Sequence, residues 1–334
     1  MNRIKTTLVG SYPVPDWYLA HPTAEVLRDA TRAVVNIQET AGIDVVCDGE
    51  LSRFDPDHPE ANGMIEYFTR RIEGIRVASL FSERLAYREA EGTRYRARPP
   101  GIVEAALGHG SLDLQLACER ARAVATHDFK FTLTGPHMLS KVVIDRHYHD
   151  REALADAFAG ILAEQVAQLD AEVIQIDEAN LPGHPEEWQW AARAMNRVLD
   201  AVKGTAAVHL CFGNYGGNSV QKGTWDKMMG YLNSLHADHV VLEMAHRPHA
   251  EIEVFRDLRP GLGLGLGVVD VKRTETETPD DIARAIERAE TVLGPGRVTY
   301  IHPDCGFSKV RRFTADAKIG VLAKGRDLYQ GGGG

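Results

Sequence analysis

Short apolar segments alternate with longer amphipathic segments along most of the chain. The apolar segments are rich in β-branched residues and end in Gly, Pro or acidic residues, which is typical of strands. The longer segments repeat apolar residues at helical spacing. Parallel strands are buried on both faces, so this pattern indicates an α/β fold that is a (β/α)8 TIM barrel rather than an open sheet. Eight strands are predicted, at residues 6–10, 43–50, 130–136, 172–178, 206–213, 238–244, 261–270 and 298–306.

The regular alternation breaks at residues 51–110. A loop rich in Pro, Asp, Asn and Gly is followed by a helical turn, and the segments at 75–80 and 84–89 favour antiparallel strands. We therefore predict an inserted antiparallel lobe after the second barrel strand. A solvated edge strand is predicted for the alternating Arg94, Arg96 and Arg98. Residues 1–330 are expected to form a single domain, with 331–334 as a disordered tail.

Composition and charge narrow the classes of partner. The chain has 334 residues and a formal net charge of -9, which opposes polyanions, so neither nucleic acid nor an anionic membrane is expected as a partner. No apolar run reaches the roughly 20 residues of a membrane span, and no secretory leader is evident. We expect a cytoplasmic protein with a small-molecule substrate. Four cysteines in a chain of this size do not make a disulfide framework, and in a reducing compartment a pair of them near His and Glu suggests a metal site.

Four potential metal ligands stand at the ends of three predicted strands. His209 and Cys211 are two residues apart in one strand and point to the same side, and Glu243 and Cys305 end two later strands. A buried Cys alone is often a packing residue, but four such residues at strand ends predict one site. Two thiolates, an imidazole and a carboxylate favour Zn²⁺ over Mg²⁺ or Ca²⁺. Glu243 is expected to be the ligand that exchanges most readily.

Further motifs occur in a fixed order at successive strand ends: VGSYP at 9–13, DGE at 48–50, LTGP at 133–136, IQIDE at 174–178, HLC at 209–211 and PDCG at 303–306. With these motifs the chain resembles the catalytic C-terminal half of cobalamin-independent methionine synthase. That family belongs to a superfamily that also holds uroporphyrinogen decarboxylase and the epoxyalkane:coenzyme M transferases. The resemblance implies a zinc-dependent methyltransferase that transfers a methyl group to the thiol of homocysteine and produces methionine.

The resemblance also implies roles for individual residues. Gly10 and Ser11 match the groups that hold the carboxylate of homocysteine, and Glu50 and Asp177 match the two carboxylates that hold its ammonium group. Asp270 matches a catalytic position, as does Glu243. Without the resemblance, the acids would be read as solvated residues at strand ends.

Two departures from the family pattern occur at positions that act on the methyl donor in the family. The family places a His two residues after the Asp that matches Asp270, and Lys272 stands there in this chain. The Trp that follows the LTGP motif in the family is also missing. The donor is accordingly expected to be methyltetrahydrofolate or a methyl-corrinoid, with a corrinoid protein as one source. His137, His147 and His149 could replace the missing acid, although each is predicted to lie on the surface.

Three other functions fit parts of the pattern. Alkyl transfer to another thiol, as in epoxyalkane:coenzyme M transferase, would require basic residues for the sulfonate where this chain has Glu50 and Asp177. A decarboxylase-like lyase would need an arginine-lined mouth for a polyanionic substrate. A binding protein with structural zinc would keep its metal ligands unchanged when a thiol is added.

Overall fold

The structure is a computed structural model that describes residues 3–89, 96–214 and 220–331. No helix within these ranges is long and apolar enough to cross a membrane. Residues 332–334, most of the predicted tail, lie outside the described residues. Gly331 ends the last helix in a left-handed conformation, with φ 76°. The expected single-domain boundary at residue 330 stays a prediction.

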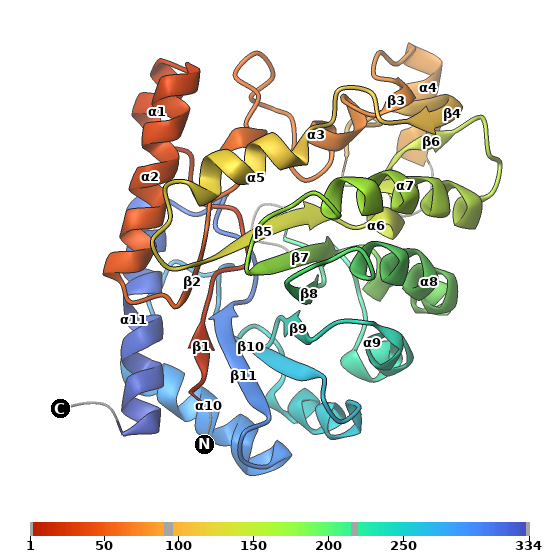
Figure 1. The fold of residues 1–334 in the computed structure, drawn as a ribbon. Helices are drawn as coiled ribbons and strands as arrows, with labels where there is room; N and C mark the ends of the chain where they lie inside the picture. Colours follow the sequence, from red (N-terminus) through yellow and green to blue (C-terminus); the bar gives the residue numbers. More distant parts are fainter. Residues whose placement is uncertain (1–2, 90–95, 215–219, 332–334) are drawn as a thin grey trace.

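Eight parallel strands form the barrel that the sequence predicts (Figure 1). Their order is β1-β11-β10-β9-β8-β7-β5-β2, and a bridge between Thr7 and Val45 joins the first strand to the last. The TIM-barrel prediction is therefore confirmed. The strands are β1 Lys5–Thr6, β2 Val45–Cys47, β5 Asp128–Thr134, β7 Val173–Glu178, β8 Thr205–Leu210, β9 His239–Leu242, β10 Gly263–Val269 and β11 Val298–Pro303.

Helices surround the barrel and bury their apolar faces against it (Figure 1). Their starts are set by local hydrogen bonds: Thr23 caps the second helix by accepting from Val26 N, and Thr278 forms a capping box with Asp281. The α-helices are α1 Asp16–Ala20, α2 Ala24–Thr40, α5 Leu114–Arg122, α6 Pro136–Val142, α7 Arg151–Val166, α8 Trp188–Leu199, α9 Met229–Ser234, α10 Pro279–Leu293 and α11 Arg312–Gln330. Short 3-10 helices are η1 Leu51–Arg53, η2 Leu181–Gly183, η3 Pro185–Glu187, η4 Trp225–Met228 and η5 His249–Asp257.

The inserted lobe lies to one side of the barrel mouth and differs in detail from the prediction (Figure 1). It contains α3 Glu66–Thr69, β3 Glu73–Arg76, α4 Phe81–Glu89 and β4 Ile102–Gly108. Strands β3 and β4 are antiparallel, so the predicted antiparallel lobe is present, but its second strand lies at 102–108 and not at the predicted 84–89. A third strand, β6 Ile144–Asp145, pairs parallel to β4 and comes from beyond the insertion. The lobe is thus fastened to the segment that follows the LTGP motif.

Two predictions about the lobe are wrong. Residues 84–89 belong to helix α4 rather than to a strand, because Glu83 accepts from Leu80 N at 2.7 Å and from the Arg76 guanidinium, which fixes the first turn. Arg96 is buried against Glu66 instead of solvated, while Arg98 is exposed and pairs with an acid at the surface. Arg94 lies outside the described residues.

Candidate metal centre and amino-acid pocket

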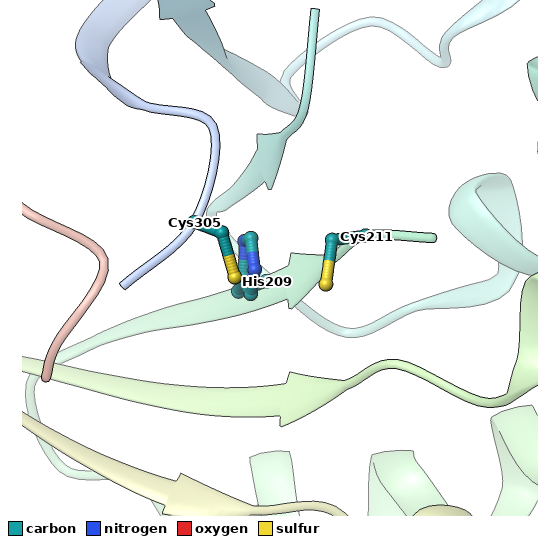
Figure 2. Close-up of side chains that lie close together, drawn as sticks. All are labelled: His209, Cys211 and Cys305. Carbon is teal, nitrogen blue, oxygen red and sulfur yellow. The ribbon is translucent and has the colours of Figure 1, made fainter. Parts of the chain in front are cut away.

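Three potential metal ligands meet at the C-terminal mouth of the barrel (Figure 2). His209 is near the end of β8, Cys211 follows that strand, and Cys305 follows β11. One ligand atom from each residue lies within 4.8 Å of the others. The sequence prediction that these residues lie together agrees with this arrangement, although their binding of a metal stays a prediction.

The ring of His209 is oriented for coordination. Its Nδ1 lies 2.9 Å from the carbonyl oxygen of Val241, a contact in which Nδ1–H donates. That tautomer leaves a lone pair on Nε2, which is buried and has no hydrogen-bond partner among the residues that the structure describes. A buried ring nitrogen without a partner is costly unless another group binds it. The ring therefore fits a metal, since a ligating His commonly donates from its other nitrogen.

The pKa values of the two thiols are shifted in opposite directions. The Cys211 thiol donates to Cys305, and this hydrogen bond, with His209 beside it, holds the pKa of Cys305 well below its ordinary value. The same bond and burial hold the pKa of Cys211 well above its ordinary value. A cation between these side chains would favour the thiolate form of both cysteines, because metal ligation requires the thiolate.

Glu243 stands just after β9 but pairs with a different partner. Both of its carboxylate oxygens lie 3.2 Å from Lys272 Nζ, and one lies 3.4 Å from Phe212 N. The cluster of His209, Cys211 and Cys305 does not include Glu243. Burial raises the pKa of Glu243, against the opposing effect of Lys272, while Glu243 and Asp304 raise the pKa of Lys272 despite its burial.

Asp304, the residue before Cys305, was not singled out from the sequence. Its carboxylate is fully buried and accepts three backbone N–H groups, from Met244 and Ala245 at 2.8 Å and from His246 at 2.7 Å. These bonds tie the turn after Glu243 to the loop that carries Cys305. Its position in the PDCG motif was the only sequence signal for this role.

A second group of residues forms the other half of the mouth. Glu50 has a left-handed backbone, with φ 58°, and its Oε1 accepts from Thr132 Oγ1 at 2.7 Å. The buried Arg53 guanidinium lies 3.3 Å from the same oxygen. Gly10 lies so close that a Cβ there would overlap Glu50 Oε1, so the glycine is required for this approach. Arg53, which holds Glu50, was missed by sequence reasoning.

Asp177 and Ser11 connect this half to the metal ligands. Asp177 pairs in register with His209 in the neighbouring strand, and Gln175 Nε2 donates to its Oδ1 at 2.7 Å. Burial, and to a lesser extent the charge of Glu50, raise the pKa of Asp177 to about 7, although His209 acts in the opposite direction. Ser11 lies against Gly306, the residue after Cys305, and a Cβ on Gly306 would overlap the Ser11 hydroxyl. Gly10, Ser11, Glu50 and Asp177 thus lie around the same mouth; their contact with a substrate stays a prediction.

Asp270 follows β10, and both of its carboxylate oxygens have hydrogen-bond partners. Oδ1 accepts from Lys272 N at 2.8 Å, and Oδ2 lies 3.1 Å from Nδ1 of His246. Asp270 also lines a cavity of about 310 Å³ between the barrel and the helices η5 and α10. His246 is a partly exposed histidine that Asp270 orients, and its sequence position alone did not reveal this pairing.

The surface prediction is wrong for one of the three histidines after the LTGP motif. His137 is buried, with Nε2 at 2.8 Å from Glu187 and Nδ1 at 3.2 Å from Glu178. Two carboxylates supply the partners that allow a polar ring to be buried there. His147 and His149 are exposed, as predicted.

Comparison with known proteins gives consistent results over the whole chain. The family model described as cobalamin-independent synthase, catalytic domain, matches residues 4–324. The methionine synthase of Thermococcus kodakarensis is 28% identical over 345 residues, covering 98% of this chain and 94% of the relative. That of Pyrococcus abyssi is 28% identical over 340 residues, covering 96% and 91%.

Solved structures show the same fold. A B12-independent methionine synthase from Shewanella sp. W3-18-1, in complex with selenomethionine, superposes with a TM-score of 0.81 at 23% identity, covering 99% of this chain and 98% of that one. A putative vitamin-B12 independent methionine synthase from Listeria monocytogenes gives a TM-score of 0.70 at 16% identity, covering 98% and 99%.

Proposed function

The chain belongs to the family of cobalamin-independent synthase catalytic domains and is a methyltransferase of that family; from this premise we propose that it methylates the thiol of homocysteine with the help of Zn²⁺ and so produces methionine. One observation carries the zinc proposal: His209 Nε2 is buried without a hydrogen-bond partner in the described part of the chain, and His209 lies in one cluster with the sulfurs of Cys211 and Cys305. An imidazole and two thiolates suit Zn²⁺.

His209, Cys211 and Cys305 would hold the ion, with Glu243 as a fourth ligand that can leave. Zinc bound there would favour ionisation of the substrate thiol and hold its sulfur in place for attack. In the transfer, a bond forms between that sulfur and the methyl carbon, and the bond from the methyl carbon to the donor breaks. The thiol gives up its proton, and the released donor takes up a proton when its methyl group leaves nitrogen.

The other half of the mouth would hold the amino-acid end of homocysteine. Glu50 and Asp177 are placed to pair with its ammonium group, and Gly10 and Ser11 with its carboxylate. Pairing with a carboxylate inside a partly desolvated pocket is strong when the geometry is fixed, and Thr132 and Gln175 fix these two side chains. The selenomethionine bound by the Shewanella enzyme supports an amino-acid ligand.

The methyl donor is proposed to be methyltetrahydrofolate or a methyl-corrinoid, the latter delivered free or by a corrinoid protein. Lys272 does not stand free as an acid in place of the family His, because its ammonium group is paired with Glu243. A cytoplasmic location is proposed, since two thiolate ligands require a reducing compartment. Coenzyme M is the weaker candidate thiol, because its sulfonate would face the carboxylates of Glu50 and Asp177.

The direct test supplies the zinc-loaded protein with homocysteine and each donor in turn and measures methionine by mass spectrometry. Methionine is expected with at least one donor, and the Cys305→Ser variant should form none. Coenzyme M with an epoxide is run in parallel. Thioether formation from coenzyme M, with no methionine from either donor, would contradict the proposal.

A further inference from the structure

The ion pair between Lys272 and Glu243 is the least expected feature of the metal half of the mouth. Both side chains are almost completely buried, with 2% and 0% of the side chain exposed. Lys272 Nζ lies 3.2 Å from each carboxylate oxygen, and among the described residues both of its hydrogen bonds go to Glu243. The backbone of Lys272 is fixed as well, because its N–H donates to Asp270 at 2.8 Å.

The nearby carboxylate of Asp304 does not compete for this lysine. Three backbone N–H groups already occupy its oxygens, at 2.7 to 2.8 Å. Asp304 therefore contributes negative charge near Lys272 without forming a hydrogen bond to it. The ammonium group is left to pair with Glu243.

Charge counting explains why Glu243 needs this partner. A Zn²⁺ ion held by the two thiolates of Cys211 and Cys305 would have its charge neutralised, so a fourth, anionic ligand would make the site negative. If a substrate thiolate takes that ligand position, the Glu243 carboxylate must remain buried without the cation. A buried carboxylate without a partner is strongly destabilising. Lys272 offers it two hydrogen bonds and an opposite charge within the same buried space.

We propose that Lys272 is a positioning residue that receives the Glu243 carboxylate when the substrate thiol takes the ligand position that Glu243 leaves. This role rests on the proposed function. The structure shows the contact that this role requires, with both Glu243 oxygens on Lys272 Nζ. Lys272 thereby lowers the cost of admitting the thiol, and it does so by way of Glu243 without touching the substrate.

The test uses the full-length protein loaded with Co²⁺ in place of Zn²⁺, because the cobalt absorption bands report a new sulfur ligand. Wild type, Lys272→Met and Lys272→Arg are titrated with L-homocysteine, and metal stoichiometry and thermal unfolding are checked for each. Lys272→Met should bind homocysteine about tenfold or more weakly, since it leaves a buried charge without its partner. Lys272→Arg should restore most of the affinity, and bound cobalt should stay at wild-type stoichiometry in both.

A double-mutant cycle separates this role from a general loss of structure. In Glu243→Gln the carboxylate charge is gone, so adding Lys272→Met to that variant should change homocysteine affinity far less than it does in wild type. Equal effects of Lys272→Met in both backgrounds would overturn the role, as would a wild-type titration curve for Lys272→Met alone. If wild type itself shows no cobalt–sulfur change with homocysteine, the proposed function fails, and the role of Lys272 fails with it.

Discussion

The two halves of the barrel mouth are built from different chemistry. The half formed by β8 to β11 presents sulfur and nitrogen atoms, and among the described residues His209 Nε2 has no hydrogen-bond partner. The half formed by β1, β2, β5 and β7 presents carboxylates whose positions are fixed by Thr132, Arg53 and Gln175. The first half is suited to a soft metal ion and the second to an ammonium group. On the proposed function, activation of the thiol and placement of the amino acid would be structurally separate tasks.

The halves meet at two points. Asp177 and His209 are register partners in neighbouring strands, and Ser11 lies against Gly306 beside Cys305. A molecule with an ammonium group, a carboxylate and a thiol a few bonds apart could therefore contact both halves at once. If the tasks are separate, substitutions in one half should leave the measured property of the other half nearly unchanged.

The largest effect is expected from loss of a sulfur ligand. Cys305→Ser or Cys211→Ser should lower zinc affinity by more than the roughly 10- to 100-fold that is typical of losing an outer-shell partner, and turnover should vanish. Zinc retention is measured by competition with a chromogenic chelator. Cys118→Ser is the matched control, because that buried thiol contacts Asp170 O away from the cluster. Full activity in either ligand variant would contradict the site.

Substitutions in the carboxylate half should have a smaller effect, and they should change amino-acid binding rather than zinc binding. Asp177→Asn and Glu50→Gln should weaken homocysteine binding about ten- to hundredfold, because each removes a charge-assisted hydrogen bond. Zinc affinity should remain that of wild type, measured with the same chelator. If either substitution removed the zinc while leaving amino-acid affinity intact, the division into two halves would be wrong.

A pH titration sharpens the same comparison. Burial raises the pKa of Asp177 to about 7, and only the ionised carboxylate can pair with an ammonium group. Methionine, which has no thiol to titrate, should bind more tightly as the pH rises through about 7. Its affinity should fall by at most about tenfold for each pH unit below that value. Calorimetry on wild type and Asp177→Asn checks this, and an identical pH profile in both would exclude Asp177 as the titrating group.

The last prediction concerns strands β9 and β11, where the expected effect on stability is absent at neutral pH. His239, stacked on Tyr300 at 4.1 Å, has its pKa lowered to about 3 by burial. The unfolded chain protonates this ring first, so its contribution to stability is lost as the pH falls from about 6.5 toward 3. The slope is at most about 1.4 kcal/mol per pH unit. The free energy of unfolding, measured in urea at several pH values, should fall less steeply toward acid pH in His239→Phe than in wild type. An unchanged slope would contradict this assignment.

The sequence predicted that His209, Cys211 and Cys305 lie together because each stands at the end of a strand whose position the hydrophobic pattern predicts. His209 and Cys211 also share one face of a strand, which spacing alone indicates. The pairing of Lys272 with Glu243 could not be predicted in this way. It joins the exits of two neighbouring strands and depends on the side-chain conformation of a long, flexible lysine.

The errors have similar causes. Residues 84–89 place Leu85 and Tyr87 at a spacing that suits a strand, but ion pairs of Glu83 with Arg76 and Arg146 lie outside that short pattern and fix the start of a helix. His137 resembles a surface residue until Glu178 and Glu187 are placed around it. Contacts between distant residues decided both cases.

The most direct test of the central claim is zinc-edge X-ray absorption on the purified, zinc-loaded protein, alone, with L-homocysteine and with coenzyme M. The account predicts that homocysteine replaces one nitrogen or oxygen neighbour of the zinc by a third sulfur and that coenzyme M does so far less. A zinc shell that neither thiol alters, or one that coenzyme M alone alters, would contradict the proposed activation of homocysteine at this site.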